Sequence, residues 1–168
     1  HQYSDSCSIA SDISRCLAVD GTGRVWVGTR EGLSLYNARK NNFTNYYYKK
    51  NNQNVVVNCI VPVEDDVLMV GTPEGAMLFD IEGQLFYNDP FPVALRNLSV
   101  TALLRDGGYV YIGGETVLYR YDLKLGTLEK LVELPSDAGI HAILSQGNSL
   151  IWVATEGRGL FKYDTIGK

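Results

Sequence analysis

The chain has 168 residues, of which 45% are hydrophobic and 20% are charged, and its formal net charge is −4. This length and composition indicate a globular domain with a sizeable core rather than a disordered chain. The weak negative charge gives nucleic acid and anionic membrane surfaces no general electrostatic reason to bind. No apolar stretch approaches the roughly 20 residues that a membrane span needs, so we expect no membrane contact by this segment.

The chain begins at His1 rather than Met, which indicates either a processed start or an engineered one, with His1 as a tag remnant. Three cysteines leave one unpaired, so they do not predict a disulfide framework. Cys16 and Cys59 are 43 positions apart and occupy equivalent places in two repeats described below. We interpret both as small buried residues, and Cys7 as a free thiol in a polar stretch.

A polar lead over residues 1–12 precedes the first structural unit, which extends over about 13–50. Apolar runs in this unit alternate with Gly- and Asp-rich turn residues, a pattern that predicts short strands joined by tight hairpins. The four expected strands are Ile13–Val19, Trp26–Thr29, a run that ends at Asn37, and Phe43–Tyr48. The last of these alternates apolar with polar residues, as expected for an exposed edge strand.

The same pattern returns three times, over about 57–90, 100–134 and 140–168. Each unit carries a marker made of a large apolar residue, an aliphatic residue and a small residue. The markers begin at Trp26, Met69, Tyr111 and Trp152, which are 43, 42 and 41 residues apart. A period of about 40–45 residues with several short strands is typical of a propeller blade. We therefore predict an all-β fold: a β-propeller fragment of about four blades, each a four-stranded antiparallel sheet, the last one incomplete.

How such blades close is open at this point. Four blades can form a closed ring, remain an open arc, or pair with a second copy. We expect the chain to be the N-terminal piece of a larger propeller, with the remaining blades as partners. An open arc would expose blade faces, which favours a homo-oligomer. The lead over residues 1–12 is a candidate for the missing edge strand of another blade.

The repeats resemble the two-component regulator propeller repeat. Its motif is an aliphatic strand, Asp-x-x-Gly, aromatic-aliphatic-Gly-Thr, then Gly-Leu and Tyr-Asp. The first repeat matches through Ile13, Asp20, Gly23, Trp26–Thr29, Gly32-Leu33 and Tyr36-Asn37. The last matches through Trp152, Thr155, Gly159-Leu160 and Tyr163-Asp164. The middle repeats depart from the motif at Met69, Tyr111 and Gly114.

The resemblance implies a seven-bladed propeller in the periplasmic sensor half of a hybrid two-component regulator of Bacteroides-like bacteria. Such sensors recognise glycan fragments and signal to a cytoplasmic histidine kinase. By this resemblance the chain would be a periplasmic part that binds an oligosaccharide and is not itself an enzyme, the kinase domain lying outside it. The shared motif is structural, so it transfers no ligand residues.

Candidate ligand residues lie in the loops after each second strand and between units, which emerge on one face around the axis. Planar polar side chains and aromatic faces suit sugars, although Glu-Gly is also an ordinary solvated turn. The candidates are Arg30, Glu31, Glu74, Arg96, Glu115, Glu156 and Arg158. We predict no catalytic residue, cofactor or metal, since no Cys/His spacing suits zinc.

Two other functions stay open. A propeller lyase or glycoside-active enzyme would need a base or a carboxylate pair, for which His141 and the loop glutamates are the available material. A lone His141 inside a strand is more typical of a structural residue. The third possibility is a protein-interaction scaffold without chemistry, because propellers host unrelated functions.

Overall fold

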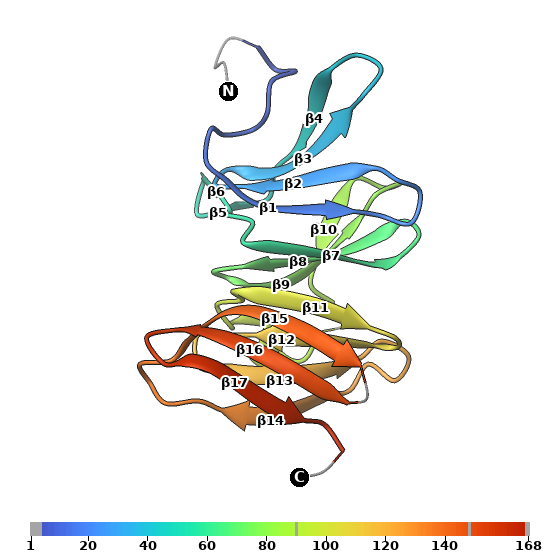
Figure 1. Ribbon diagram of the computed structural model, residues 1–168. Helices are drawn as coiled ribbons and strands as arrows, with labels where there is room; N and C mark the ends of the chain where they lie inside the picture. Colours follow the sequence, from blue (N-terminus) through green and yellow to red (C-terminus); the bar gives the residue numbers. More distant parts are fainter. Residues whose placement is uncertain (1–4, 90, 148, 167–168) are drawn as a thin grey trace.

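The computed structural model describes residues 5–89, 91–147 and 149–166. It is an all-β chain of four small antiparallel sheets that follow one another in sequence order (Figure 1). This confirms the predicted fold of four propeller blades. We call the sheets blades 1 to 4 and give their strands from the innermost strand outward.

The first three blades have four strands each and the fourth has three, as predicted. Blade 1 contains β1 (Ser14–Val19), β2 (Val25–Thr29), β3 (Gly32–Asn37) and β4 (Asn42–Tyr46). Blade 2 contains β7 (Cys59–Glu64), β8 (Val67–Thr72), β9 (Gly75–Asp80) and β10 (Leu85–Tyr87). Blade 3 contains β11 (Ala102–Asp106), β12 (Tyr109–Gly113), β13 (Val117–Asp122) and β14 (Leu128–Glu133). Blade 4 contains β15 (Gly139–Gly147), β16 (Leu150–Glu156) and β17 (Gly159–Asp164).

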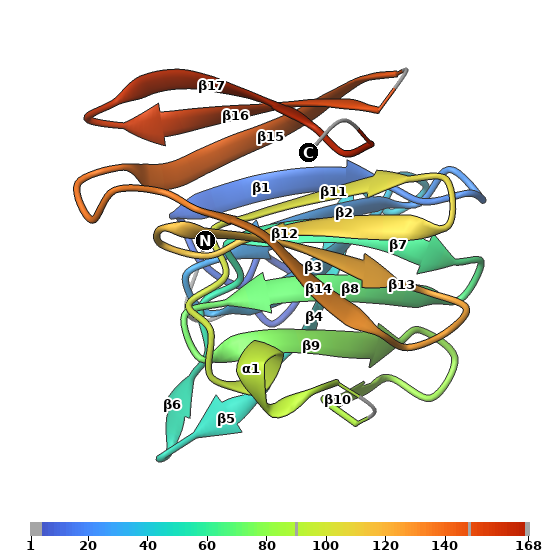
Figure 2. The same cartoon turned by 90° about the horizontal axis from the view of Figure 1, so that it is seen from below.

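Two small elements in the connections between blades were not predicted. The connection from blade 1 to blade 2 forms a hairpin of β5 (Lys49–Lys50) and β6 (Gln53–Asn54). The next connection contains a one-turn helix, α1 (Val93–Arg96), which lies beside β9 (Figure 2). Within the described residues this helix is far too short to span a membrane.

The small residue of each marker lets adjacent blades approach closely. A Cβ added at Gly28 would lie 2.4 Å from Cys16 Sγ and 2.6 Å from Val57 Cγ1 of blade 2. Gly71 and Val100 repeat this contact between blades 2 and 3, with 2.6 Å between the added Cβ and Val100 Cγ1. The glycines are therefore required by the packing of one sheet on the next, as the sequence pattern indicated.

The hydrophobic core is divided among the three junctions between blades. Trp26 and Leu33 of blade 1 pack with Val57 and Phe79 of blade 2. A second cluster joins blades 2 and 3 and includes the connection residues Phe91 and Leu95. The third joins blade 3 to blade 4. Each blade is thus stabilised mainly by burial against its neighbours rather than by a core of its own.

Cys7, Cys16 and Cys59 are free thiols. Cys16 and Cys59 lie at equivalent places in β1 and β7 and are half-buried. Burial raises the pKa of Cys16 to about 11. Burial, and to a smaller extent the neighbouring Cys16, raises the pKa of Cys59 still further. Burial therefore favours the protonated form of both thiols, which is the less nucleophilic one.

Candidate functional site

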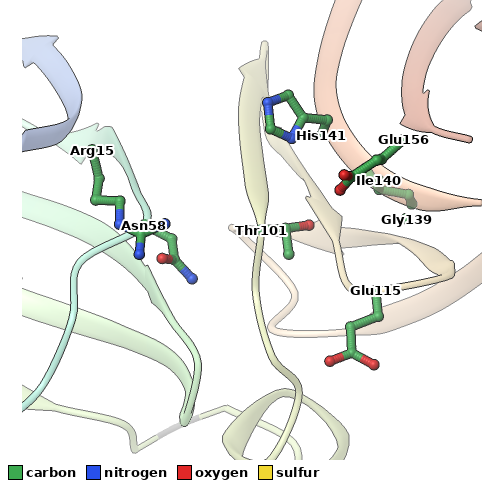
Figure 3. Close-up of a pocket in the computed structure, with 8 residues that line it drawn as sticks. All are labelled: Arg15, Asn58, Thr101, Glu115, Gly139, Ile140, His141 and Glu156. Atoms are coloured by element: carbon green, nitrogen blue, oxygen red, sulfur yellow. The ribbon is translucent and has the colours of Figure 1, made fainter. Parts of the chain in front are cut away.

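A cavity of about 390 Å³ opens where the innermost strands of all four blades begin (Figure 3). We call it the axial mouth. Most of its lining side chains are polar, and none of them is Phe, Tyr or Trp. The lining residues are Arg15, Asn58, Thr101, Glu115, Gly139, Ile140, His141 and Glu156.

Four of these residues occupy one and the same position in the four blades. Each directly precedes the innermost-strand residue that pairs with the small marker residue. The pairs are Cys16 with Gly28, Cys59 with Gly71, Ala102 with Gly113, and Ala142 with Ala154. The equivalent lining residues, which we call the axial ring, are Arg15, Asn58, Thr101 and His141. The ring presents a guanidinium, an amide, a hydroxyl and an imidazole to one cavity.

The ring residues from the middle blades are fixed by hydrogen bonds to the backbone. Asn58 Nδ2 donates to the Val100 carbonyl of the next blade at 3.0 Å. Thr101 Oγ1 lies 3.2 Å from the carbonyls of both Gly113 and Gly114. Polar groups held in this way are positioned before any ligand arrives, which reduces the entropy lost on binding.

Two glutamates complete the mouth from the loops that follow the second strands of blades 3 and 4. Glu115 follows β12 and Glu156 ends β16. In Figure 3 they lie on the same side as His141, whereas Arg15 and Asn58 lie on the other side. Within the described residues, Arg15, Glu115 and Glu156 form no ion pair. The mouth therefore offers cationic and amide donors on one side and free carboxylate acceptors on the other.

Two of the other predicted residues line a second cavity of about 280 Å³, beside the connections between blades. Its ionic groups already have partners. Lys50 Nζ lies 2.5 Å from Glu74 Oε2. Arg96 Nη2 lies 2.8 Å from Asp89 Oδ1, and its Nε donates to the Phe91 carbonyl at 2.6 Å. A ligand there would have to displace these contacts, so this cavity is the weaker candidate.

The remaining predicted residues lie elsewhere. Arg158 Nη2 is 2.7 Å from Asp137 Oδ2, an ion pair between the β16–β17 loop and the connection from blade 3 to blade 4. Arg30 and Glu31 line neither cavity. The structure thus brings Glu115 and Glu156 together in the axial mouth, places Glu74 and Arg96 in the second cavity, and separates the other three. Among the described residues, no group of three or more His, Cys, Asp or Glu side chains could hold a metal ion.

Sequence reasoning missed Arg15, Asn58 and Thr101 because it looked for ligand residues in loops and not at the beginnings of strands. The signal was present in the repeat alignment. Arg15 and Asn58 are 43 residues apart, as are Asn58 and Thr101. A polar residue that recurs at one position among small or apolar neighbours is expected to face a solvent-filled axis.

The two component regulator propeller model matches residues 8–31, which cover the end of the lead and the first two strands. The resemblance inferred from the first repeat is therefore confirmed. Among curated proteins, none is similar enough to the chain to count as a match.

Solved structures share the fold. The extracellular domain of the putative hybrid two component system BT4673 from B. thetaiotaomicron is 22% identical, with a TM-score of 0.77 over 95% of this chain and 21% of that one. That of the putative hybrid two component system BT3049 from B. thetaiotaomicron is 18% identical, with a TM-score of 0.78 over 98% of this chain and 22% of that one. The computationally designed Ika4 protein is 12% identical, with a TM-score of 0.68 over 94% of each chain. The chain thus spans about a fifth of the length of the two extracellular domains.

Proposed function

We propose that this chain is the N-terminal part of a periplasmic sensor domain of a hybrid two-component system, and that it binds a glycan-derived ligand in the axial mouth. The observation that carries the proposal is the axial ring together with Glu115 and Glu156, which line the same cavity and form no ion pair within the described residues. The family match at residues 8–31 and the likeness to extracellular domains of hybrid two component systems support the sensor role. Signalling would pass to a cytoplasmic histidine kinase outside this chain.

The chemistry of the mouth suits a hydroxyl-rich ligand. Carboxylates such as those of Glu115 and Glu156 accept hydrogen bonds from sugar hydroxyls, and Arg15 and Asn58 donate to hydroxyl or carboxylate oxygens. Among the described lining residues there is no Phe, Tyr or Trp on which a sugar ring could stack. Phe91, in the connection from blade 2 to blade 3, is only 1% exposed and packs edge-on against Tyr121, so its ring does not reach a ligand. Affinity would therefore come from hydrogen bonds, and we expect it to be modest for this chain alone.

Titration calorimetry of the purified chain with a panel of neutral and acidic oligosaccharides tests the proposal. For any oligosaccharide that binds in this panel, we expect Arg15→Gln and Glu156→Gln to weaken the affinity by about tenfold or more. Each substitution removes a charge-assisted hydrogen bond. Arg39→Gln and Glu82→Gln are matched controls, since both residues are exposed and lie outside the mouth.

Equal affinities of the mouth variants and their controls would place the ligand elsewhere and reject this site. Cleavage of an oligosaccharide by the purified chain, abolished in Glu156→Gln, would instead favour the glycoside-active enzyme. The enzymatic assay and the calorimetry can be run on the same samples.

A further inference from the structure

Three cavities adjoin one another among the loops and connections that join the strands and blades. Between the axial mouth and the second cavity lies a third cavity of about 300 Å³, which we call the middle cavity. Glu115 lines both the axial mouth and the middle cavity, and Asn97 lines both the middle cavity and the second cavity. Since each neighbouring pair shares a wall residue, we call the series the loop-face groove. The middle cavity is lined by Asn97, Leu98, Ser99, Glu115, Thr116 and Val117.

The chain departs from its own repeat at the middle cavity. In blades 1 and 2 the marker ends in a threonine, Thr29 or Thr72. Its hydroxyl accepts from the backbone N–H two residues later and donates to the carbonyl three residues later. Blade 3 has Gly114 at this position, and a Cβ added there would lie 2.5 Å from Leu98 Cδ1. The connection from blade 2 therefore packs against the loop that carries Glu115.

The same connection, which contains α1 (Figure 2), is anchored at a second point. A Cβ added at Gly75 of blade 2 would lie 2.4 Å from the Arg96 carbonyl oxygen, so the connection touches the loop of blade 2 there. Asn97 stands between these contacts, which are made by Arg96 and Leu98, and its own side chain is exposed. The backbone that carries Asn97 is thus positioned before a ligand binds, which reduces the entropy lost on binding.

The polar side chains of the middle cavity suit sugar hydroxyls. Asn97, Ser99 and Thr116 provide one amide and two hydroxyls, and within the described part of the chain these side chains form no hydrogen bond. They can exchange hydrogen bonds with sugar hydroxyls, which both donate and accept. Glu115, at the passage to the axial mouth, adds a carboxylate that accepts from hydroxyls and repels an anionic sugar.

The second cavity supplies an aromatic ring, which no described lining residue of the axial mouth does except the imidazole of His141. Tyr48 lines this cavity and is half-buried, with 6.1 Å between the centroids of its ring and that of Phe86. The ionic groups of Lys50 and Arg96 are both in ion pairs. Paired charges attract an anion weakly, so this cavity favours an uncharged sugar ring over a uronate or a sulfate ester.

We infer that the loop-face groove binds a neutral, linear oligosaccharide lengthwise, with one end in the axial mouth and a sugar ring on Tyr48. The inference rests on the proposed function, because it extends the ligand already placed in the mouth. The middle and second cavities lie among blades 1 to 3 and their connections, away from the outer surfaces of the first and last blades.

The sizes of the cavities call for a ligand longer than one that fills the mouth. Each cavity is near the lower end of the roughly 300–1,000 Å³ typical of small-molecule sites, so only an extended chain occupies all three. The ion pairs make the second cavity a weak site by itself. For a ligand already held in the mouth, however, the outer contacts form at little further cost in entropy.

Titration calorimetry with neutral oligosaccharides of increasing length tests the inference. The probes are linear xylo-, manno- and cello-oligosaccharides of two, four and six sugars. In a series that binds, we expect the affinity of the native chain to rise by about tenfold or more from two sugars to six. The longer probe adds several hydrogen bonds and one contact with an aromatic ring.

Two variants remove the outer contacts and leave the axial mouth intact. Asn97→Ala/Thr116→Ala removes polar groups of the middle cavity. Tyr48→Leu removes the aromatic ring of the second cavity and keeps an apolar side chain beside Phe86. Each variant should weaken the binding of the six-sugar probe by about three- to tenfold and leave that of the two-sugar probe unchanged.

Matched controls carry the same kinds of substitution outside the groove. They are Gln53→Ala/Thr127→Ala and Tyr47→Leu, because these residues are exposed and line none of the three cavities. Both controls should bind every probe as the native chain does. Circular dichroism should confirm that all the variants are folded.

The outcomes separate the groove from the mouth. A six-sugar probe that binds no more tightly than its two-sugar member would overturn the inference, and so would full affinity of both outer variants. If Arg15→Gln still weakens all the probes in those cases, the proposed function stands and only the groove is wrong. If no probe binds, or if Arg15→Gln binds as tightly as the native chain, the proposed function fails and the inference fails with it.

Discussion

The indole nitrogen of Trp26 donates a hydrogen bond to the buried carboxylate of Asp20 across 2.8 Å. The same carboxylate accepts from Arg24 Nε at 2.6 Å and from Thr22 Oγ1 at 2.8 Å. Arg24 continues across the junction to the Asp65 carbonyl of blade 2. In blade 4 the equivalent bond joins Trp152 Nε1 to the neutral Gln146 Oε1 at 2.8 Å. The Asp20–Arg24 ion pair thus connects the turn and the marker residue of the first repeat to the next blade.

We predict that Asp20→Asn lowers the free energy of unfolding by about 2–4 kcal/mol at pH 7. The substitution weakens the hydrogen bonds to Trp26 and Arg24, and the Asp20 side chain is 0% exposed. Urea unfolding followed by Trp fluorescence measures this. Asp66→Asn is the control, since its carboxylate is 58% exposed where it meets Arg24 and should contribute less than about 1 kcal/mol. Equal losses in the two variants would contradict the prediction.

The Asp20 carboxyl should also give the stability a pH dependence. Burial alone would raise its pKa, but the hydrogen bonds from Trp26, Arg24 and Thr22 outweigh burial and hold the pKa well below its usual range. A depressed carboxyl pKa stabilises the fold above the unfolded value of about 3.9, and this contribution is lost as the pH falls below it. Between pH 7 and about pH 3, the free energy of unfolding should therefore fall less in Asp20→Asn than in Asp66→Asn.

Gly28→Ala is expected to cost about 1–3 kcal/mol by overpacking, because its Cβ would meet Cys16 Sγ at 2.4 Å and Val57 Cγ1 at 2.6 Å. Gly108→Ala is the matched control: an added Cβ there meets nothing within 4 Å. Thermal unfolding by circular dichroism should separate the two. A Gly28→Ala variant as stable as Gly108→Ala would show that the junction between blades 1 and 2 is looser than described.

The two tryptophans at the marker position should respond differently to truncation. Trp26 is 0% exposed, so Trp26→Ala should reduce the free energy of unfolding by about 3–5 kcal/mol. Trp152 is only half-buried and lines an open groove on blade 4, so Trp152→Ala should reduce it by less, about 1–2 kcal/mol. Urea unfolding of both variants, followed by circular dichroism, measures the two losses. Losses of similar size in both variants would contradict the prediction.

The thiols should differ in reactivity. Burial raises the pKa of Cys16 and Cys59, so little thiolate forms, whereas Cys7 is exposed. We expect iodoacetamide at pH 8 to label one site in the native chain and three in urea, as read by mass spectrometry. Cys7→Ser should remove the native label. Rapid native labelling of Cys16 or Cys59 would show that the first junction opens readily.

The sequence predicted the architecture because each blade repeats the same local signals. The markers at Trp26 and Met69 recur with turn residues between them, and hairpin registers follow from such turns. The β5–β6 hairpin and α1 were not predicted, because they occur once each and have no repeat to reinforce their weak local patterns.

The candidate site was predicted in part. Glu115 and Glu156 follow from the general location of propeller loops and do line the axial mouth. Arg30 and Arg158 do not line that mouth. Their positions depend on the direction of each side chain and on ion pairs such as Arg158 with Asp137, and neither can be predicted from the repeat pattern. Arg15 was overlooked because a charged residue next to buried Cys16 in an inner strand becomes meaningful only once the axis is placed.

Asn58 of the axial ring stands between Val57 and Cys59, which both pack against the small marker residues. In β1 and β15 the ring residue is the extra residue of a β-bulge, between Ser14 and Cys16 and between Ile140 and Ala142, and a bulge changes the direction of its side chain. Each blade thus contributes one side chain to the wall of the cavity, and this side chain can change without altering the packing between blades. Recognition can drift blade by blade during evolution while the architecture stays constant.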